Sequence, residues 1–335
     1  MEHVGRADVL KGNDMIYAPV VIPTLNRYEH LKQCLESLSR CIWADKTEVY
    51  VALDYPPQDK WDKYAPGWEK NRDWLHSVGD MGFKKLHLIE RTENYGTWQP
   101  GDKGNAKCLV EDLTKQYDRY IYSEDDNVFS PNFLEFMDKG LEKFENDDKV
   151  DSLIGYRWYF PIKTKDNSFM RITTDYTPWG VGYWVKKRPC LDYLWFKKQL
   201  KLRTLFCLYR QYGSGIVGSL FEFARSAHKD EIMIDRHIRA YLMLTNKHTI
   251  VPTVSLVKNI GLDGSGFTMG SNDKSMQDLY DSIPMSIEEH FEFIGTGYEE
   301  YEYNNVLYLH EREWQGKRFY NKRMIKKILK YIFTR

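Results

Sequence analysis

Short apolar runs alternate with amphipathic helical patterns along the first 145 residues of the chain. The apolar runs have the composition of buried strands and lie at 18–23, 48–54, 85–91 and 119–123. Helical patterns follow them at 28–40, 61–78 and 106–116, and again after Pro131, where Ser130 is the expected N-cap. Such alternation predicts a mainly parallel sheet with helices on its faces and right-handed crossovers.

The second half of the chain has a less regular pattern. We expect a fifth strand at 152–157, a helix at 230–244 and a final strand at 249–256. Aromatic residues and turns dominate 156–184, basic residues are frequent over 186–229, and 258–270 is a glycine-rich loop. The sequence shows no internal repeat and no low-complexity linker, and a chain of 335 residues could form one large or two ordinary domains.

Composition excludes several classes of protein. A chain of 335 residues with 42% hydrophobic and 15% aromatic side chains can build a core, so wholesale disorder is excluded. The 48 basic and 48 acidic residues cancel, which argues against a general nucleic-acid binder. The five cysteines lack metal-ligand spacing, so we expect reduced thiols. Because no signal-peptide pattern is visible, we expect a cytoplasmic protein.

Three consecutive acids, Glu124, Asp125 and Asp126, follow the predicted strand at 119–123. In an open α/β sheet, ligands bind at the carboxyl ends of the strands. Three adjacent carboxylates repel one another unless a cation lies among them, and a divalent ion that carries a ligand's phosphates is the usual solution. A solvated acidic turn before a helix is the alternative interpretation.

Polar residues and glycines follow the other predicted strands as well. They are Pro23, Thr24 and Arg27 after the first strand, Asp54 after the second, and Asn94, Gly96, Gly104 and Lys107 after the third. Hydroxyl, guanidinium and carboxylate groups suit the base, ribose and phosphates of a nucleotide, and glycines let backbone approach phosphates. Turn and cap formation explains each residue separately, but all of them would meet at one edge of one sheet.

Four segments together resemble the GT-A glycosyltransferases, which are inverting nucleotide-sugar enzymes with a single Rossmann-like domain. These segments read VVIPTLNRYEHLKQCLESL, VALDYPP, ENYGTWQPGDKGNA and YIYSEDDNVFSPNFLEFM, within roughly 18–265. The last is similar to the acidic segment of the N-acetylglucosaminyltransferase I type. The resemblance implies that Asp126 binds Mn²⁺ or Mg²⁺, with Glu124 and Asp125 beside it in the donor site. EDD replaces the common D-x-D pattern, which leaves the division of roles among the acids open.

Further segments extend the resemblance. TDYTPWGVGYW is similar to the segment that shapes the donor-sugar and acceptor pocket, which implies pocket roles for Trp179, Gly180 and Gly182. NIGLDGSG resembles the loop that closes over the donor and contains Asp263 and Gly264. Inverting transfer also needs a base, because attack at the anomeric carbon leaves a proton on the acceptor oxygen. Asp235 falls where related enzymes place this base, and Asp230 and Glu231 compete for the role.

The resemblance implies a GT-A domain over 18–310, with a nucleotide-binding half at 18–150 and a donor-sugar and acceptor half at 151–310. A lead-in at 1–17 precedes it, and a basic tail at 311–335 follows. Residues 317–335 hold eight basic residues and no acid, with apolar positions on one helical face. Such a helix suits an anionic membrane surface, which would be the inner face of the cell membrane. Packing of this helix on its own domain is the alternative interpretation.

We therefore expect an enzyme that transfers a sugar from a nucleotide-diphosphate donor, with a uridine nucleotide implied by the resemblance, to a hydroxyl of a glycan or lipid-linked glycan. A metal-dependent sugar nucleotidyltransferase is an alternative, although PTLNR lacks the glycine-rich basic loop that such enzymes carry after their first strand. A non-catalytic sugar- or membrane-binding relative of the same fold is the other alternative.

Overall fold

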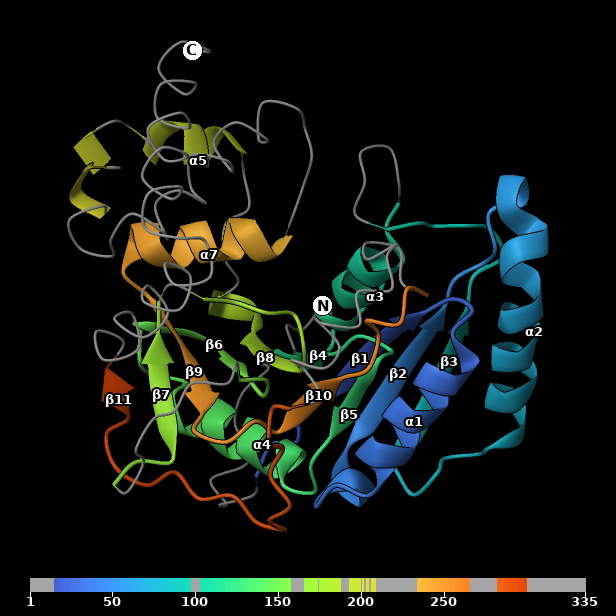
Figure 1. Ribbon diagram of the computed structural model, residues 1–335, viewed down its shortest axis with the longest axis horizontal. Helices are drawn as coiled ribbons and strands as arrows, with labels where there is room; N and C mark the ends of the chain where they lie inside the picture. Colours follow the sequence, from blue (N-terminus) through green and yellow to red (C-terminus); the bar gives the residue numbers. More distant parts are fainter. Residues whose placement is uncertain are drawn as a thin grey trace, which may run out of the picture.

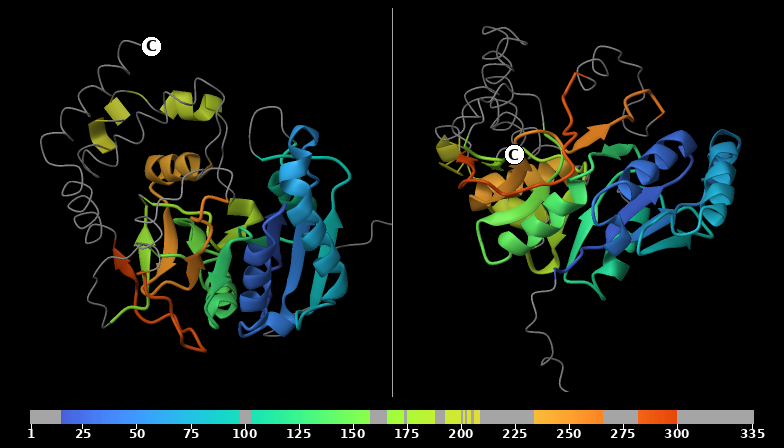
Figure 2. Two further views of the ribbon diagram at one scale, coloured as in Figure 1. Left: turned by 45° about the vertical axis from the view of Figure 1, so that its right-hand side comes forward. Right: turned by 90° about the horizontal axis from the view of Figure 1, so that it is seen from below.

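The computed structural model describes residues 15–97, 103–157, 166–173, 175–187, 193–199, 201, 203–204, 206–208, 234–265 and 282–299. Figures 1 and 2 show a mixed α/β arrangement built on one large twisted sheet. Within the described residues, this sheet has the strand order β11-β7-β9-β6-β8-β4-β1-β2-β3. The predicted fold class, a mainly parallel sheet flanked by helices, is confirmed.

The first half of the chain builds the parallel side of the sheet. Its strands are β1 (Val20–Thr24), β2 (Glu48–Leu53), β3 (Lys85–Glu90) and β4 (Arg119–Tyr122), and β1 pairs in parallel with β2 and β4. Its helices are α1 (Tyr28–Ser39), α2 (Trp61–Ser77), α3 (Asn105–Leu113) and α4 (Phe133–Lys143). Short 3₁₀ helices lie at Ala44–Lys46, Gln58–Lys60 and Val185–Lys187.

The second half adds strands of both directions. They are β6 (Val150–Ile154), β7 (Phe169–Ile172), β8 (Val181–Trp184), β9 (His248–Pro252) and β11 (Tyr298–Glu299). β8 runs antiparallel to both of its neighbours, β4 and β6. Two further strands, β5 (Asn127–Phe129) and β10 (Val257–Asn259), form a separate antiparallel pair. Helices α5 (Tyr193–Gln199) and α7 (Ile234–Thr245) lie on one side of the sheet, with α7 between the sheet and α5 (Figure 1).

The core follows the apolar pattern of the sequence. β1 is buried on both faces, as expected for a central parallel strand, and Val20, Val21 and Ile22 have no exposed surface. The predicted inner face of α1 is also buried, and its residues are Leu31, Cys34, Leu35 and Leu38. No helix among the described residues has the length and apolar character needed to cross a bilayer.

The structure corrects three local predictions. The acid triplet is followed by strand β5 before the helix begins, and α4 starts at Phe133 with Asn132, not Ser130, in the N-cap position. Ser130 instead donates a hydrogen bond from Oγ to Asn132 Oδ1 at 2.7 Å. The final strand ends at Pro252, because the chain then crosses to pair as β10 with β5.

A fourth prediction is too coarse. The aromatic and glycine segment before residue 185 was expected to be rich in turns, whereas its last four residues form β8 inside the sheet. Residues 1–14, 230–233 and 311–335 lie outside the described residues, and with them lie most of the lead-in, Asp230 and Glu231, and the basic tail.

Candidate functional site

Arg27 lies between two members of the acid triplet. Its Nη1 donates to Asp126 Oδ2 at 2.7 Å, and its Nη2 contacts Asp125 Oδ1. This meeting is possible because β1 and β4 are parallel neighbours, so the residues after each strand reach the same edge of the sheet. Burial opposes the charge on Arg27, but the two carboxylates outweigh burial and raise its pKa further. The group is therefore a buried ionic cluster.

Neutral donors complete the hydrogen bonding of the two aspartates. Thr24 Oγ1 donates to Asp125 Oδ2 at 2.7 Å, and Asn259 Nδ2 donates to Asp126 Oδ1 at 2.7 Å. Together with the Arg27 contacts, each carboxylate oxygen of Asp125 and Asp126 has a protein partner. The side chains of Asp125 and Asp126 are only 6% and 8% exposed, which rules out the solvated acidic turn.

Glu124 has a different environment. Its Oε2 accepts a hydrogen bond from Trp179 Nε1 at 2.9 Å, and the Trp179 ring meets the Tyr156 ring edge to face at 4.6 Å. Burial and the charge of Asp126 raise the pKa of Glu124 to about 8. Burial also raises the pKa of Asp126, although Arg27 opposes this. The triplet thus combines one acid that is held by an indole N–H with two aspartates that face Arg27.

The loop after β10 covers the aspartates. A Cβ atom on Gly261 would lie 1.9 Å from Asp126 Oδ2 and 3.0 Å from Arg27 Nη1, so only glycine fits there without rearrangement. Asp263 of this loop lies 3.3 Å from His30 of α1, measured between Oδ2 and Nε2. Gly264 has a φ of +84°, a conformation that favours glycine. The loop itself was predicted from the sequence, but no separate role was predicted for Asn259 or Gly261.

Asp54 holds the loop that follows β3. Its carboxylate accepts hydrogen bonds from the backbone amides of Tyr95 and Gly96, at 2.8 and 2.9 Å, and from Asn94 Nδ2 at 3.3 Å. Burial raises the pKa of Asp54, and these amides oppose the rise. The structure therefore brings Asp54, Asn94 and Gly96 together. The Asp54 carboxylate accepts hydrogen bonds that fix the loop after β3.

The remaining residues expected at this edge have separate surroundings. Pro23 is part of β1, and Gly104 precedes α3 with a φ of +78°. The Lys107 side chain is 51% exposed, and its Nζ lies 4.0 Å from Glu111 Oε1. Gly104 N donates to Tyr95 O at 2.7 Å, so its backbone meets the loop after β3, whereas the amine of Lys107 points to a neighbour on its own helix.

Two of the three expected pocket residues before and in β8 are packing positions. A Cβ on Gly180 would lie 2.8 Å from the Phe133 ring, and one on Gly182 would lie 3.2 Å from Met137 Sδ, so both glycines make room for α4. Only Trp179 contacts the acid triplet. Trp184, the last residue of β8, is buried in the core, and its Nε1 donates to Leu141 O at 2.9 Å.

Asp235 lies in the first turn of α7 and is half-buried. Its helix is connected to the triplet indirectly, through the segment 175–180. One turn further along α7, Arg239 Nη2 donates to Asp175 Oδ1 at 2.7 Å, and Trp179 of the same segment contacts Glu124.

The aspartate pair has the ligand chemistry of a Mg²⁺ or Mn²⁺ site but lacks a complete protein cage. Carboxylate oxygens are the ligands that these ions prefer. Among the described residues, no group of three or more His, Cys, Asp or Glu side chains has the arrangement of a metal site. Mg²⁺ commonly binds through one or two carboxylates together with substrate phosphates and water. Asp125 and Asp126 fit that mode once Arg27 yields a carboxylate oxygen.

Comparison with protein-family models gives no match, and comparison with curated proteins gives none either. Among solved structures, the chain is similar to S. aureus TarS 1–349, with 14% identity, a TM-score of 0.38, and coverage of 72% of this chain and 60% of that chain. It is also similar to a mannosyltransferase from Pyrobaculum calidifontis in complex with GDP-Man and Mn²⁺, with 11% identity, a TM-score of 0.36, and coverage of 96% and 89%.

A third similar structure is the glycosyltransferase GlyE of Streptococcus pneumoniae TIGR4, with 14% identity, a TM-score of 0.30, and coverage of 69% of this chain and 45% of that chain. This chain therefore spans less than two thirds of the TarS and GlyE structures. Similarities at these TM-scores do not identify the reaction of this chain.

Proposed function

We propose that this protein is an inverting glycosyltransferase that moves a sugar from a nucleoside-diphosphate donor to a hydroxyl of a glycan or lipid-linked glycan. The observation that carries the proposal is the buried cluster at the carboxyl edge of the sheet, where Asp125 and Asp126 meet Arg27 and Thr24 from the end of β1. Acidic and basic groups at that edge suit a donor that carries both phosphates and hydroxyls. A uridine nucleotide is the first donor to test, on the sequence resemblance alone.

The residues of the cluster have distinct roles in this proposal. Asp126, with Asp125 beside it, would hold Mn²⁺ or Mg²⁺, and Arg27 is the cation of the cluster that a diphosphate would meet. When bound, the metal would neutralise the charge that develops on the leaving diphosphate. Trp179 supplies an aromatic face beside Glu124, where a sugar ring would stack.

The transfer itself exchanges one bond at the anomeric carbon. The acceptor oxygen forms a bond to this carbon, the bond from the carbon to the diphosphate oxygen breaks, and the nucleoside diphosphate leaves with the electron pair. The acceptor hydroxyl loses its proton to a carboxylate, for which we propose Asp235. Attack from the face opposite the leaving group inverts the configuration.

The test is nucleoside-diphosphate release from a panel of nucleotide sugars, with and without Mn²⁺, by the wild type and Asp126→Ala. Asp112→Ala is the control, because Asp112 is an exposed acid whose partner is Lys115 on the surface. We expect one donor to be turned over in a metal-dependent way, at least 100-fold more slowly in Asp126→Ala and unchanged in Asp112→Ala. If the wild type instead binds a nucleotide sugar but releases no nucleoside diphosphate from it, with or without Mn²⁺, the protein is a non-catalytic relative of the same fold.

Membrane association and a cytoplasmic, peripheral location stay predictions. Membrane association depends on the basic tail at 311–335, which lies outside the described residues, whereas the location rests on the sequence pattern alone. A vesicle-binding comparison of the full chain with a chain ending at residue 310 would test the membrane association.

A further inference from the structure

The segment 175–180 contacts both the acid triplet and α7. At one end, Asp175 Oδ1 accepts a hydrogen bond from Arg239 Nη2 of α7 at 2.7 Å. Near the other end, Trp179 Nε1 donates to Glu124 Oε2 at 2.9 Å. A chain of five residues thus connects a helix of the second half to the acids that follow β4. The connection matters because Asp235, the base of the proposed function, lies on that helix.

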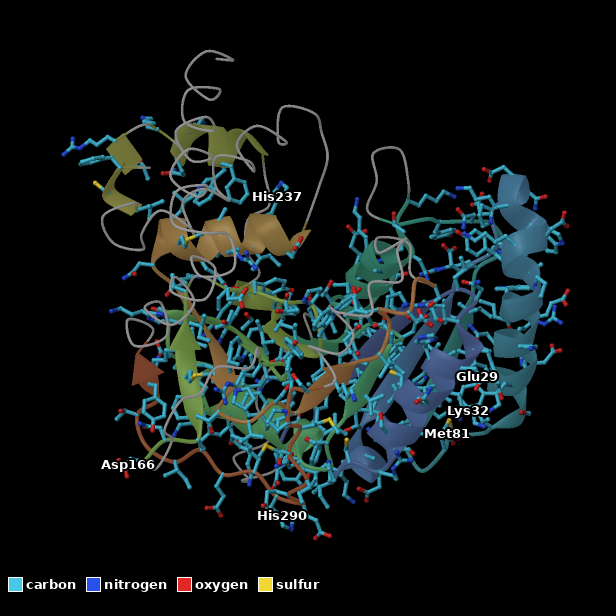
Figure 3. All side chains as sticks on the ribbon, viewed as in Figure 1. Glu29, Lys32, Met81, Asp166, His237 and His290 are labelled. Carbon is cyan, nitrogen blue, oxygen red and sulfur yellow. The ribbon has the colours of Figure 1, made fainter. Side chains whose placement is uncertain are left out.

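Asp235 and Arg239 share one face of α7. They are four residues apart, which places them about 40° from each other around the helix axis. His237 and Tyr241 lie on another face, where they contact Phe196 and Trp195 of α5 with ring centroids 5.6 and 5.7 Å apart. Figure 3 shows His237 on the side of α7 that faces α5.

The face that carries Asp235 therefore turns away from α5 and toward the segment 175–180. Burial raises the pKa of Tyr176, and the charge of Asp235 adds to this rise after those of Tyr120 and Asp151, which agrees with this orientation. Arg239 reaches Asp175 from the same face. Asp235 and the Arg239 contact are thus presented together to residues 175 and 176.

The segment between the two contacts is held firmly against the sheet. Tyr176 is 3% exposed, and its hydroxyl contacts that of Tyr183 in β8. Gly155 N donates to Gly180 O at 2.8 Å, and the Trp179 ring meets Tyr156. Because these contacts fix the segment to β6 and β8, it provides a rigid reference point for α7 relative to the acid triplet.

We propose that the Asp175–Arg239 ion pair is the positioning contact that holds Asp235 at a fixed place relative to the donor site. The proposal rests on the proposed function, in which Asp235 removes the acceptor proton. Neither Asp175 nor Arg239 touches the reacting atoms; they act through the placement of the first turns of α7. Loss of the pair moves the carboxylate of Asp235, which lowers the rate of the transfer step without weakening donor binding.

The test compares Asp175→Asn, Arg239→Met and the conservative Arg239→Lys with the wild type. The matched control is Arg171→Met, because Arg171 and Asp147 form an ion pair at 3.0 Å with side chains 20% and 32% exposed, close to the 32% and 15% of Arg239 and Asp175. Two quantities are measured for the full chain: amide hydrogen exchange of residues 234–239, and kcat and KM for the donor.

We expect Asp175→Asn and Arg239→Met to speed exchange in residues 234–239 and to lower kcat about 10- to 100-fold, with KM for the donor within about twofold of the wild type. Arg239→Lys should recover part of kcat, because it restores the charge but not the planar fork. The control should leave both quantities unchanged. A general loss of stability from breaking an ion pair would change exchange and kcat in the Arg171→Met control as well. Changes confined to the Asp175 and Arg239 variants therefore indicate positioning.

Two results overturn the inference. If amide exchange of residues 234–239 is unchanged in Asp175→Asn, the Asp175–Arg239 contact does not hold α7. If this exchange is faster but kcat is unchanged, the contact holds α7 but does not affect the reaction. If the wild type turns over no donor, the proposed function fails and the catalytic part of the inference falls with it. The exchange data then still decide whether the pair fixes α7.

Discussion

Asp138 offers a quantitative test of the burial of polar groups in this fold. It lies on α4 with no exposed surface, and its Oδ1 accepts a hydrogen bond from the backbone amide of Ala18 at 2.9 Å. Its Oδ2 has no hydrogen-bond partner among the described residues. Burial raises the pKa of Asp138 to about 8, against the opposing effects of the Ala18 amide and the charge of Arg119. The folded protein therefore keeps this carboxyl protonated at neutral pH.

The consequence is a loss of stability as pH rises. In the unfolded chain an aspartate ionises near its ordinary pKa of about 3.9, so between about pH 4 and about pH 8 the folded state binds one more proton. The free energy of unfolding then falls by about 1.4 kcal/mol per pH unit from this group. Asp138→Asn removes the titration but keeps the acceptor for Ala18. From pH 5 to pH 7, the free energy of unfolding of the variant should therefore rise by about 3 kcal/mol relative to that of the wild type.

Urea unfolding at pH 5, 6 and 7 measures this difference, with Asp147→Asn as the control. Burial raises the pKa of Asp147, but hydrogen bonds from Arg171 and the Lys149 amide outweigh it and lower the pKa overall. The stabilisation from Asp147 is thus present above its ordinary pKa and is lost only as pH falls below it, so the control difference should stay constant from pH 5 to 7. Parallel curves for Asp138→Asn and the wild type would refute the reasoning, because they would mean that Asp138 is ionised in the folded protein.

Three further substitutions test the site and its supports. Gly261→Ala places a Cβ 1.9 Å from Asp126 Oδ2, so we expect binding of a nucleoside diphosphate, measured by calorimetry, to weaken by the equivalent of about 1–3 kcal/mol. Trp179→Phe keeps a ring but removes the N–H bonded to Glu124, and should lower the free energy of unfolding in urea by about 1–3 kcal/mol. Lys187→Met should cost about 3 kcal/mol in the same assay, because Lys187 Nζ donates to three backbone carbonyls near the end of α4 and the start of β6.

Each of these predictions has a clear contrary result. Normal diphosphate binding by Gly261→Ala would mean that the loop after β10 does not cover the site in solution. A Trp179→Phe variant as stable as the wild type would mean that Glu124 finds another donor. An unchanged urea midpoint for Lys187→Met would mean that water satisfies the three carbonyls, although the contacts to Phe144 O and Val150 O are buried in the structure.

The sequence by itself determined the first half of the fold. The strands at 18–23, 48–54, 85–91 and 119–123 correspond to β1 to β4 within one or two residues, and the apolar face of α1 is the buried one. The central strand β1 is predictable because a buried parallel strand is a short, continuously apolar run, and α1 because a covering helix repeats its apolar residues every three or four positions. β3, at the edge of the sheet, is partly exposed and still shows apolar residues between polar ones. The position of the acid triplet at a strand end follows from the same pattern.

Only the tertiary structure decided which residues complete the site. Thr24 and Asp125 are 101 residues apart in the chain, and Asn259 and Asp126 are 133 apart, yet each pair shares a hydrogen bond of 2.7 Å. The antiparallel insertion of β8 brings Trp179 to Glu124. Local patterns contain no signal for such partners, because a side chain's neighbours across a sheet depend on the path of the whole chain. The sequence thus determined where the acids lie along the chain, and the fold determined that a guanidinium, an amide and an indole surround them.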